Sequence, residues 1–273
     1  MPISRTARVR RLSLLTAAVW LTACGDSGTG GRDAGTPPVA ATTSPAAASP
    51  APSPAAVAAA DSSACTNEAD FNAGTQLTYD LQQTSPGRPT GTTHHGVTTG
   101  KRQSFGGATP VAFEQTFYDA GKKPFATATI LRDLVDGKMV RYGETHGGGT
   151  RATSTHTPVP AIPVSMQPGQ TVTLAYRVET VSPGAKVAMD VTEALTYQGR
   201  EKLSTALGTF DTCRFVLAST TTMGKSPDIT VDVTSWIAAE GPFRGQRLKA
   251  FVPATGGRPE STDVVTQMSY APK

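Results

Sequence analysis

The sequence has little of what the common kinds of active site require. It has three cysteines and four histidines in 273 residues, and no two cysteines have the Cys-x-x-Cys spacing of a redox centre. No Gly-x-Ser-x-Gly motif supplies the nucleophile of a serine hydrolase, and the run Gly147-Gly148-Gly149 lacks the lysine of a phosphate-binding loop. Aromatic residues make up 6% of the chain, which is low for a carbohydrate-binding platform built on exposed rings. The sequence therefore predicts no catalytic residue and no cofactor.

A basic excess is also absent once the first 23 residues are set aside. The whole chain has 25 Lys and Arg against 21 Asp and Glu. Residues 1–23 hold four arginines and no acidic residue, so the remainder has 25 − 4 = 21 basic residues against 21 acidic ones. A near-neutral chain gives no electrostatic reason to expect a nucleic-acid partner, and it lacks the polybasic patch that binds anionic lipid.

The N-terminus does carry a signal. A basic start is followed by an apolar run from Leu12 to Leu21, which is too short for a stable membrane span and is typical of a secretory signal peptide. Leu21-Thr22-Ala23-Cys24 is similar to a lipobox, in which the cysteine is acylated and the leader is cut before it. We therefore expect a signal peptide over 1–23 and attachment to the membrane through lipid on Cys24. Gly25, in a Gram-negative bacterium, favours the periplasmic face of the outer membrane.

The mature chain divides into two parts by composition. Residues 24–63 are largely Ala, Pro, Ser, Thr and Gly, which offer almost nothing to bury, and they predict a disordered tether. Residues 64–273 are long enough for a single β domain.

Short alternating runs recur through that second part. Leu77, Tyr79 and Leu81 form one such run, and Ile229, Val231 and Val233 form another, with turn residues between the runs. This pattern predicts an all-β fold with a curved antiparallel sheet, a half-barrel or open barrel of about ten to twelve strands.

The stretch from Gly143 to Gly169 is rich in glycine and proline, and it predicts a long loop between two halves. Each half opens on a glycine that leads into an alternating strand, at Gly74 and at Gly169, 95 residues later. Any two β-strands can share such a pattern, so both a duplication and a coincidence remain open.

With Cys24 carrying lipid, Cys65 and Cys213 remain. One pair of cysteines in an exported domain favours a disulfide, although two unpaired small apolar residues are the alternative.

The remaining candidates are histidines and one tryptophan. His94 and His95 are adjacent, so on a strand their rings point to opposite faces and cannot easily hold one ion. His146 and His156 lie in or beside the glycine-rich stretch and are weak candidates for a surface metal site, with exposed loop histidines as the alternative. Trp236 is expected to cover one end of the core, and a ligand-stacking role is the alternative.

Several segments resemble an uncharacterised class of bacterial envelope lipoproteins. The segments are Gly74 to Tyr79, Pro168-Gly169, the Gly208-Thr209-Phe210 turn before Cys213, and the late strand with Trp236. The resemblance implies a curved antiparallel sheet or half-barrel similar to periplasmic lipoprotein carriers, and it implies no activity.

Together these features predict a lipid-anchored periplasmic lipoprotein with a binding or scaffolding role. Its partner would be a protein or a small apolar ligand held in the concave face of the sheet. An envelope hydrolase with a dispersed active site is the alternative. A cleft of convergent polar side chains would favour the hydrolase, and a cleft lined by apolar side chains would favour the binding protein.

Overall fold

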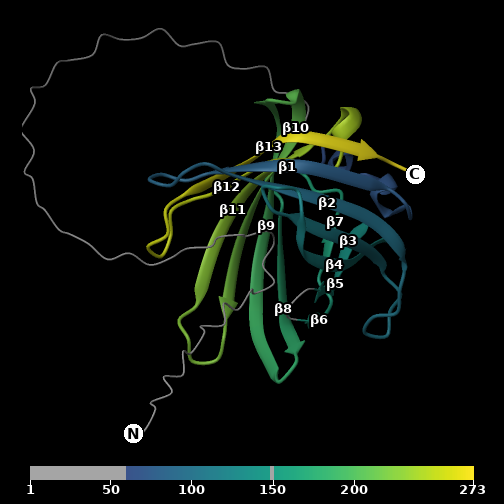
Figure 1. Ribbon diagram of the computed structural model, residues 1–273, viewed down its shortest axis with the longest axis vertical. Helices are drawn as coiled ribbons and strands as arrows, with labels where there is room; N and C mark the ends of the chain where they lie inside the picture. Colours follow the sequence, from purple (N-terminus) through teal and green to yellow (C-terminus); the bar gives the residue numbers. More distant parts are fainter. Residues whose placement is uncertain (1–59, 148–150) are drawn as a thin grey trace, which may run out of the picture. The chain divides into compact units, whose positions relative to one another are not determined.

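Thirteen β-strands account for most of the residues that the computed structural model describes, 60–147 and 151–273 (Figure 1). The strands are β1 (Gln76–Thr84), β2 (Gly91–Arg102), β3 (Val111–Tyr118), β4 (Pro124–Val135), β5 (Lys138–Gly147), β6 (Ala152–Thr157), β7 (Ala161–Pro163), β8 (Thr171–Ser182), β9 (Ala185–Thr205), β10 (Gly208–Thr222), β11 (Ile229–Ala238), β12 (Arg247–Val252) and β13 (Ser261–Ala271). Three short 3₁₀ helices accompany them: η1 (Ser63–Cys65), η2 (Glu68–Phe71) and η3 (Gly241–Phe243). Within the described ranges, no helix is long and apolar enough to cross a membrane.

Twelve of these strands form a closed antiparallel barrel in the order of the sequence. Each strand pairs with the strands before and after it, β6 pairs with β8, and β13 pairs with β1 to close the ring. The short strand β7 is the extra one and pairs with β5. The predicted all-β class and curved antiparallel sheet are confirmed, and the pairing of β13 with β1 closes the sheet.

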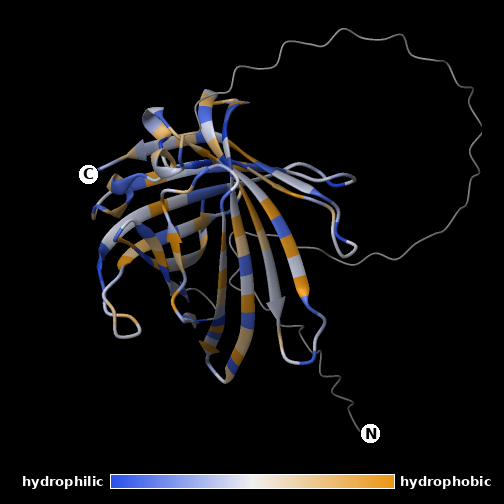
Figure 2. Ribbon diagram, turned by 180° about the vertical axis from the view of Figure 1, so that it is seen from behind, coloured by the Kyte–Doolittle hydropathy of each residue, from blue (hydrophilic) through white to orange (hydrophobic). Residues whose placement is uncertain are grey.

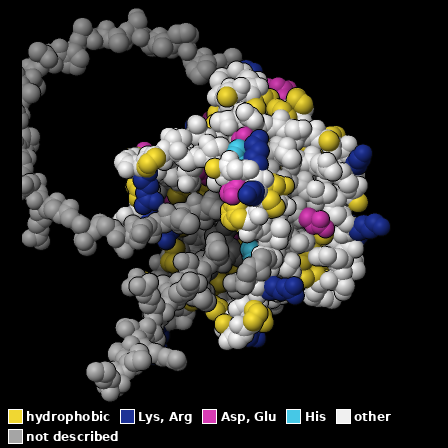
Figure 3. Space-filling view, in the orientation of Figure 1, with side chains coloured by type: hydrophobic (Ala, Val, Ile, Leu, Met, Phe, Trp, Pro, Cys, Tyr) yellow, Lys and Arg dark blue, Asp and Glu magenta, His cyan; other side chains and the backbone are white. Residues whose placement is uncertain are grey.

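Apolar and polar residues alternate along the strands, as the orange and blue bands in Figure 2 show. On β9 the buried positions are Met189, Val191, Glu193 and Tyr197, which are two or four residues apart. Because side chains on a strand alternate between its two faces, these residues point into the barrel and those between them point outward. On the face shown in Figure 3, Lys and Arg side chains are scattered among uncharged ones.

The two halves of the barrel, β1–β6 and β8–β13, repeat one arrangement. In each half, the second strand has an extra residue opposite the third, after Thr99 on β2 and after Tyr197 on β9. Thr99 and Tyr197 each pair with a phenylalanine, Phe113 on β3 and Phe215 on β10. The similarity between Gly74 and Gly169 therefore belongs to a repeat that extends through both halves.

A second pair of bulges strengthens the correspondence. Tyr142 on β5 and Leu248 on β12 are extra residues opposite the preceding strand, and an arginine comes directly before each, Arg141 and Arg247. A bulge bends its strand and raises the local twist. Bulges at equivalent places therefore give the two halves the same curvature.

The prediction of a long loop from Gly143 to Gly169 is wrong. This stretch holds the end of β5 and all of β6 and β7. The apolar period is missing there because the buried position on β6 is Ser154, whose hydroxyl lies 2.9 Å from that of Thr180 on β8.

The N-terminal segment, residues 60–75, crosses the end of the barrel at which β1 and β8 begin. Ser62 is buried, and its hydroxyl donates to the Val164 carbonyl at 2.7 Å and accepts from the Met166 N–H at 2.9 Å. Farther along, the Asp70 carboxylate accepts from the Tyr270 hydroxyl at 2.7 Å, and Phe71 packs edge-on against Phe113, 5.3 Å between ring centres. These contacts join the N-terminal segment to strands of both halves of the barrel, β3 and β13.

The predicted tether, 24–63, lies outside the described residues except for its last four positions. Those four are held by the barrel: the Tyr197 hydroxyl donates to the Ala60 carbonyl at 2.9 Å, and Ser165 donates to Asp61 at 2.6 Å. Residues 60–63 therefore belong with the barrel. The composition of residues 60–63 does not indicate this, because hydrogen bonds rather than apolar contacts hold most of them.

Candidate functional site

A cleft of about 350 Å³ lies on the outer face of the barrel over β13, β1 and β2, and we call it the dyad cleft. Its polar lining residues include Asp80, His94, Tyr118, Lys122, Gln267 and Ser269. The Nδ1 atom of His94 lies 2.5 Å from Oδ1 of Asp80, and the two side chains are 18% and 19% exposed. Because a carboxylate only accepts hydrogen bonds, Nδ1 carries the proton and Nε2 is the acceptor nitrogen in the neutral ring.

The register of the sheet explains why these side chains meet. Asp80 on β1 pairs directly with His94 on β2 and with Gln267 on β13, while His94 pairs with Tyr118 on β3. Directly paired residues of neighbouring strands have their side chains on the same face, about 5 Å apart. Amide, carboxylate, imidazole and phenol therefore stand in one row across four strands.

The position beside this row has no side chain. Gly96 follows His94 by two residues on the same face, and a Cβ atom there would lie 3.3 Å from the Tyr118 hydroxyl. The Tyr118 phenol therefore leans over bare backbone. The absence of a Cβ at Gly96 therefore makes room for the Tyr118 ring.

Lys122 reaches the cleft from the turn between β3 and β4. Its φ of +58° is left-handed, and the turn is held by Asp119, whose Oδ1 accepts from the N–H groups of Gly121 and Lys123, each at 2.9 Å. Such a turn fixes the backbone of a residue that would otherwise be mobile. The backbone of Lys122 is thus held in a defined place at the rim of the cleft.

His95 lies on the inner face, beneath the dyad cleft. It is 4% exposed, and its ring stacks on Tyr79 with 4.8 Å between centres. Burial lowers its pKa to about 4, with the charge of Arg247 acting in the same direction, so the ring stays neutral near pH 7. The prediction that His94 and His95 point to opposite faces is confirmed.

The second half of the barrel provides an internal comparison for the dyad row. When Phe113 is matched to Phe215 and Thr99 to Tyr197, the row Asp80–His94–Tyr118 falls on Ala175–Thr192–Thr220, which are paired with one another in the same way. The fold therefore forms this face without a carboxylate, an imidazole or a phenol. The ionisable row is a feature of one half and is not required by the architecture.

A second ionic group lies on the inner face. The Arg141 guanidinium donates to the Glu193 carboxylate, which also accepts from the Tyr176 hydroxyl at 2.9 Å, and Glu193 is 4% exposed by side chain. Arginine precedes the bulge in both halves, Arg141 and Arg247, and burial lowers the pKa of Arg247. Because both halves have an arginine at this position, we attribute these two arginines to the fold rather than to a binding site.

The two histidines considered for a metal site are held apart by different partners. His146 on β5 bonds through Nε2 to Glu144 at 2.9 Å, and this bond raises its pKa. His156 on β6 donates from Nδ1 to the Arg141 carbonyl at 3.1 Å, and burial lowers its pKa. Within residues 60–147 and 151–273, no three His, Cys, Asp or Glu side chains come together to hold a metal ion. Both histidines lie on strands, β5 and β6, in the stretch that the sequence predicts to be a loop.

A second hollow, of about 610 Å³, lies over the ends of β4, β5, β6 and β8. Thr129, Thr145 and Thr153 stand side by side across three of these strands. Threonine is favoured on exposed sheet surfaces for its β propensity. This row is therefore accounted for by strand formation.

Trp236 lies on β11 and is 9% exposed. Its ring is flanked by two cations, with the Lys249 amine 4.7 Å and the Arg214 guanidinium 5.7 Å from the ring centre, and its indole N–H donates to Glu201. Side chains from three strands thus cover the ring. Its neighbour Ile237 pairs with Cys213 and packs against the buried cluster, so Trp236 points to the opposite face and does not cover that core.

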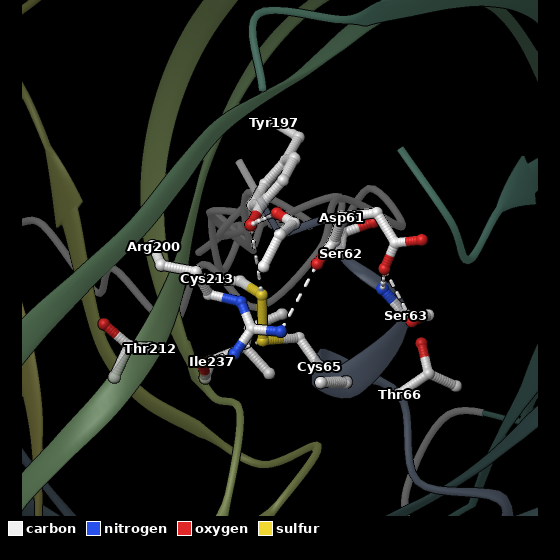
Figure 4. Close-up of a disulfide and its surroundings, with 12 residues drawn as sticks. Asp61, Ser62, Ser63, Cys65, Thr66, Tyr197, Arg200, Thr212, Cys213 and Ile237 are labelled. Atoms are coloured by element: carbon white, nitrogen blue, oxygen red, sulfur yellow. Dashed lines mark hydrogen bonds between the residues drawn. A yellow bond between two sulfur atoms is a disulfide. The ribbon is translucent and has the colours of Figure 1, made fainter. Parts of the chain in front are cut away.

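The structure contains the predicted disulfide between Cys65 and Cys213, 148 residues apart (Figure 4). It joins the N-terminal segment to β10, and both cysteines belong to a buried cluster with Met166, Tyr197 and Ala239. Arg200 adds a contact by donating to the Asp61 carbonyl at 3.3 Å. Cys24 lies outside the described residues.

Sequence reasoning considered His94 only as half of a pair that could not easily hold one ion, and it missed Asp80, Tyr118 and Lys122. Their meeting depends on the register of three strand pairs and on the geometry of one turn. Spacing along the chain carries no signal of either.

No family model matches the chain, and no curated protein matches it. Among solved structures, it is similar to one from Bacteroides fragilis described as an exported protein with a YmcC-like fold, at 12% identity and a TM-score of 0.48, covering 72% of this chain and 96% of that one. A lipoprotein from Parabacteroides distasonis is 9% identical with a TM-score of 0.46, covering 73% and 96%. The lipoprotein YmcC from Escherichia coli is 11% identical with a TM-score of 0.32, covering 73% and 88%. At these values the likeness assigns neither a ligand nor a reaction.

Proposed function

We propose that the protein is a lipid-anchored protein of the cell envelope whose barrel binds a small anionic ligand in the dyad cleft. The observation that carries the proposal is the row Asp80–His94–Tyr118, present in one half of the barrel and replaced by Ala175–Thr192–Thr220 in the other. Ionisable groups gathered in a concave surface without an architectural need are typical of binding sites.

The chemistry of the lining indicates the class of ligand. Lys122, Tyr118, Gln267 and Ser269 offer hydrogen-bond donors, while the one carboxylate of the row, Asp80, already accepts from His94. These four donors facing one cleft fit a ligand with charged acceptor oxygens, such as a carboxylate or a phosphate ester. The ligand we infer is thus polar, in place of the apolar ligand expected in the concave face.

Binding can be followed on the histidines themselves. In full-length mature protein with labelled histidines, titration with inorganic phosphate at constant pH and ionic strength should shift the His94 imidazole resonances saturably. Lys122→Ala should weaken this response about fivefold or more, because it removes a cation at the rim. His146 and His156 serve as internal controls. If His94 responds no more than His146 does, the cleft binds no anion.

The anchor is tested separately. Cys24→Ser should move the protein from the membrane fraction to the soluble fraction, because two or more acyl chains at ~0.8 kcal/mol per buried methylene supply the attachment. The measurement is fractionation followed by a high-salt wash, with mass spectrometry of the N-terminal peptide for acylation. Retention of the serine variant on membranes at high salt would show that the anchor lies elsewhere.

A further inference from the structure

We propose that the dyad cleft hydrolyses a carboxylic ester, with His94 as general base and Asp80 as its positioning residue; this rests on the proposed binding function. The dyad has the arrangement that general-base catalysis needs. Asp80 accepts from Nδ1 at 2.5 Å and so fixes both the tautomer and the orientation of the ring. Nε2 of His94 has no partner among residues 60–147 and 151–273, so it can accept a proton from water.

The surroundings supply the second requirement, stabilisation of a developing oxyanion. Tyr118 is the direct cross-strand neighbour of His94, and Lys122 lies at the rim of the same cleft. Both are donors, and preorganised donors beside a carbonyl stabilise the tetrahedral intermediate. The Tyr118 ring lies over Gly96, which places its hydroxyl beside this row.

The reaction needs only water as co-reactant. A water oxygen attacks the ester carbonyl carbon while His94 Nε2 takes one of its protons, and the carbonyl electrons move onto the oxygen held by Lys122 and Tyr118. When the intermediate collapses, the bond from carbon to the alcohol oxygen breaks and His94 returns the proton to that oxygen. The products are one carboxylic acid and one alcohol, and the imidazole is again neutral.

The second half of the barrel indicates which substitutions the fold tolerates. Asp80→Ala, His94→Thr and Tyr118→Thr each place in the first half the residue that the second half has at the corresponding position. The matched control is Thr192→His, which adds a histidine to the equivalent outer face, opposite Ala175 and without a carboxylate partner. Thermal unfolding of each variant checks that the barrel is intact.

The experiment measures hydrolysis of p-nitrophenyl acetate by full-length mature protein in detergent. We expect saturable turnover, with kcat falling about 100-fold in His94→Thr and about tenfold or more in Asp80→Ala, as for loss of a general base and of its positioning group. KM should change little in Asp80→Ala, because Asp80 acts through its hydrogen bond to Nδ1 of His94. Thr192→His should leave the rate of the parent protein unchanged.

Two results would overturn the proposal. One is a parent rate no higher than that of free imidazole at equal concentration, and the other is a His94→Thr variant as active as the parent. The phosphate titration separates the two proposals: a saturable His94 response without ester turnover removes hydrolysis and leaves binding, whereas loss of both removes both.

Discussion

Replacement of Cys65 by alanine lowers the free energy of unfolding by about 2–5 kcal/mol, which for a domain of this size is a fall of roughly 5–15 °C in Tm. The disulfide closes a loop of 148 residues, so its loss restores much freedom to the unfolded chain. It also leaves Cys213, which is 0% exposed, without its covalent partner in the buried cluster.

The measurement is thermal or urea unfolding of the parent and of Cys65→Ala, each with and without reductant. Reductant should bring the parent to the midpoint of the variant and leave the variant unchanged. Thiol labelling of unfolded, unreduced parent protein should find neither Cys65 nor Cys213. Labelling of both would contradict the bridge.

Replacement of Glu193 by alanine costs about 3–5 kcal/mol, the usual penalty for removing one partner of a buried ion pair. The change leaves the Arg141 guanidinium in the barrel interior without its carboxylate, and the Tyr176 hydroxyl without its acceptor. Urea unfolding followed by circular dichroism provides the measurement.

The chain offers a matched exposed pair as the control. Arg177 and Asp190 pair across β8 and β9, 3.0 Å apart, with side chains 54% and 65% exposed. Asp190→Ala should change the free energy of unfolding by about 0–1 kcal/mol, because water screens such a pair. Equal losses in the two variants would mean that burial does not govern the Glu193 pair.

The strands could be predicted where one face is apolar. The runs through Leu77, Tyr79 and Leu81 and through Ile229, Val231 and Val233 lie on β1 and β11. β6 was missed because its buried position is a serine, so the period of two has no apolar residues to mark it. On β13 the alternation changes phase, since Thr266 is an extra residue opposite β1 and Val265 is buried.

The candidate site was accessible from the sequence only in part. The adjacency of His94 and His95 is enough to place one ring inside the barrel and one outside, because strands alternate. Asp80 becomes the partner of His94 through the hairpin register of β1 and β2, and Tyr118 joins through that of β2 and β3. A shift of one residue in either hairpin would have turned a whole strand over and separated them.

The N-terminal segment also decides where mechanical force enters the barrel. Tension on the chain at Ala60 first meets the hydrogen bonds from Tyr197 and Arg200, and then the covalent link from Cys65 to Cys213. That link leads to β10, which is paired along its length with β9 and β11. The pulling force is therefore applied to β10, and the stretch from Thr66 to β1 does not carry it. Pulling on the N-terminus therefore does not act directly on the pairing of the first strand, β1, with the last, β13.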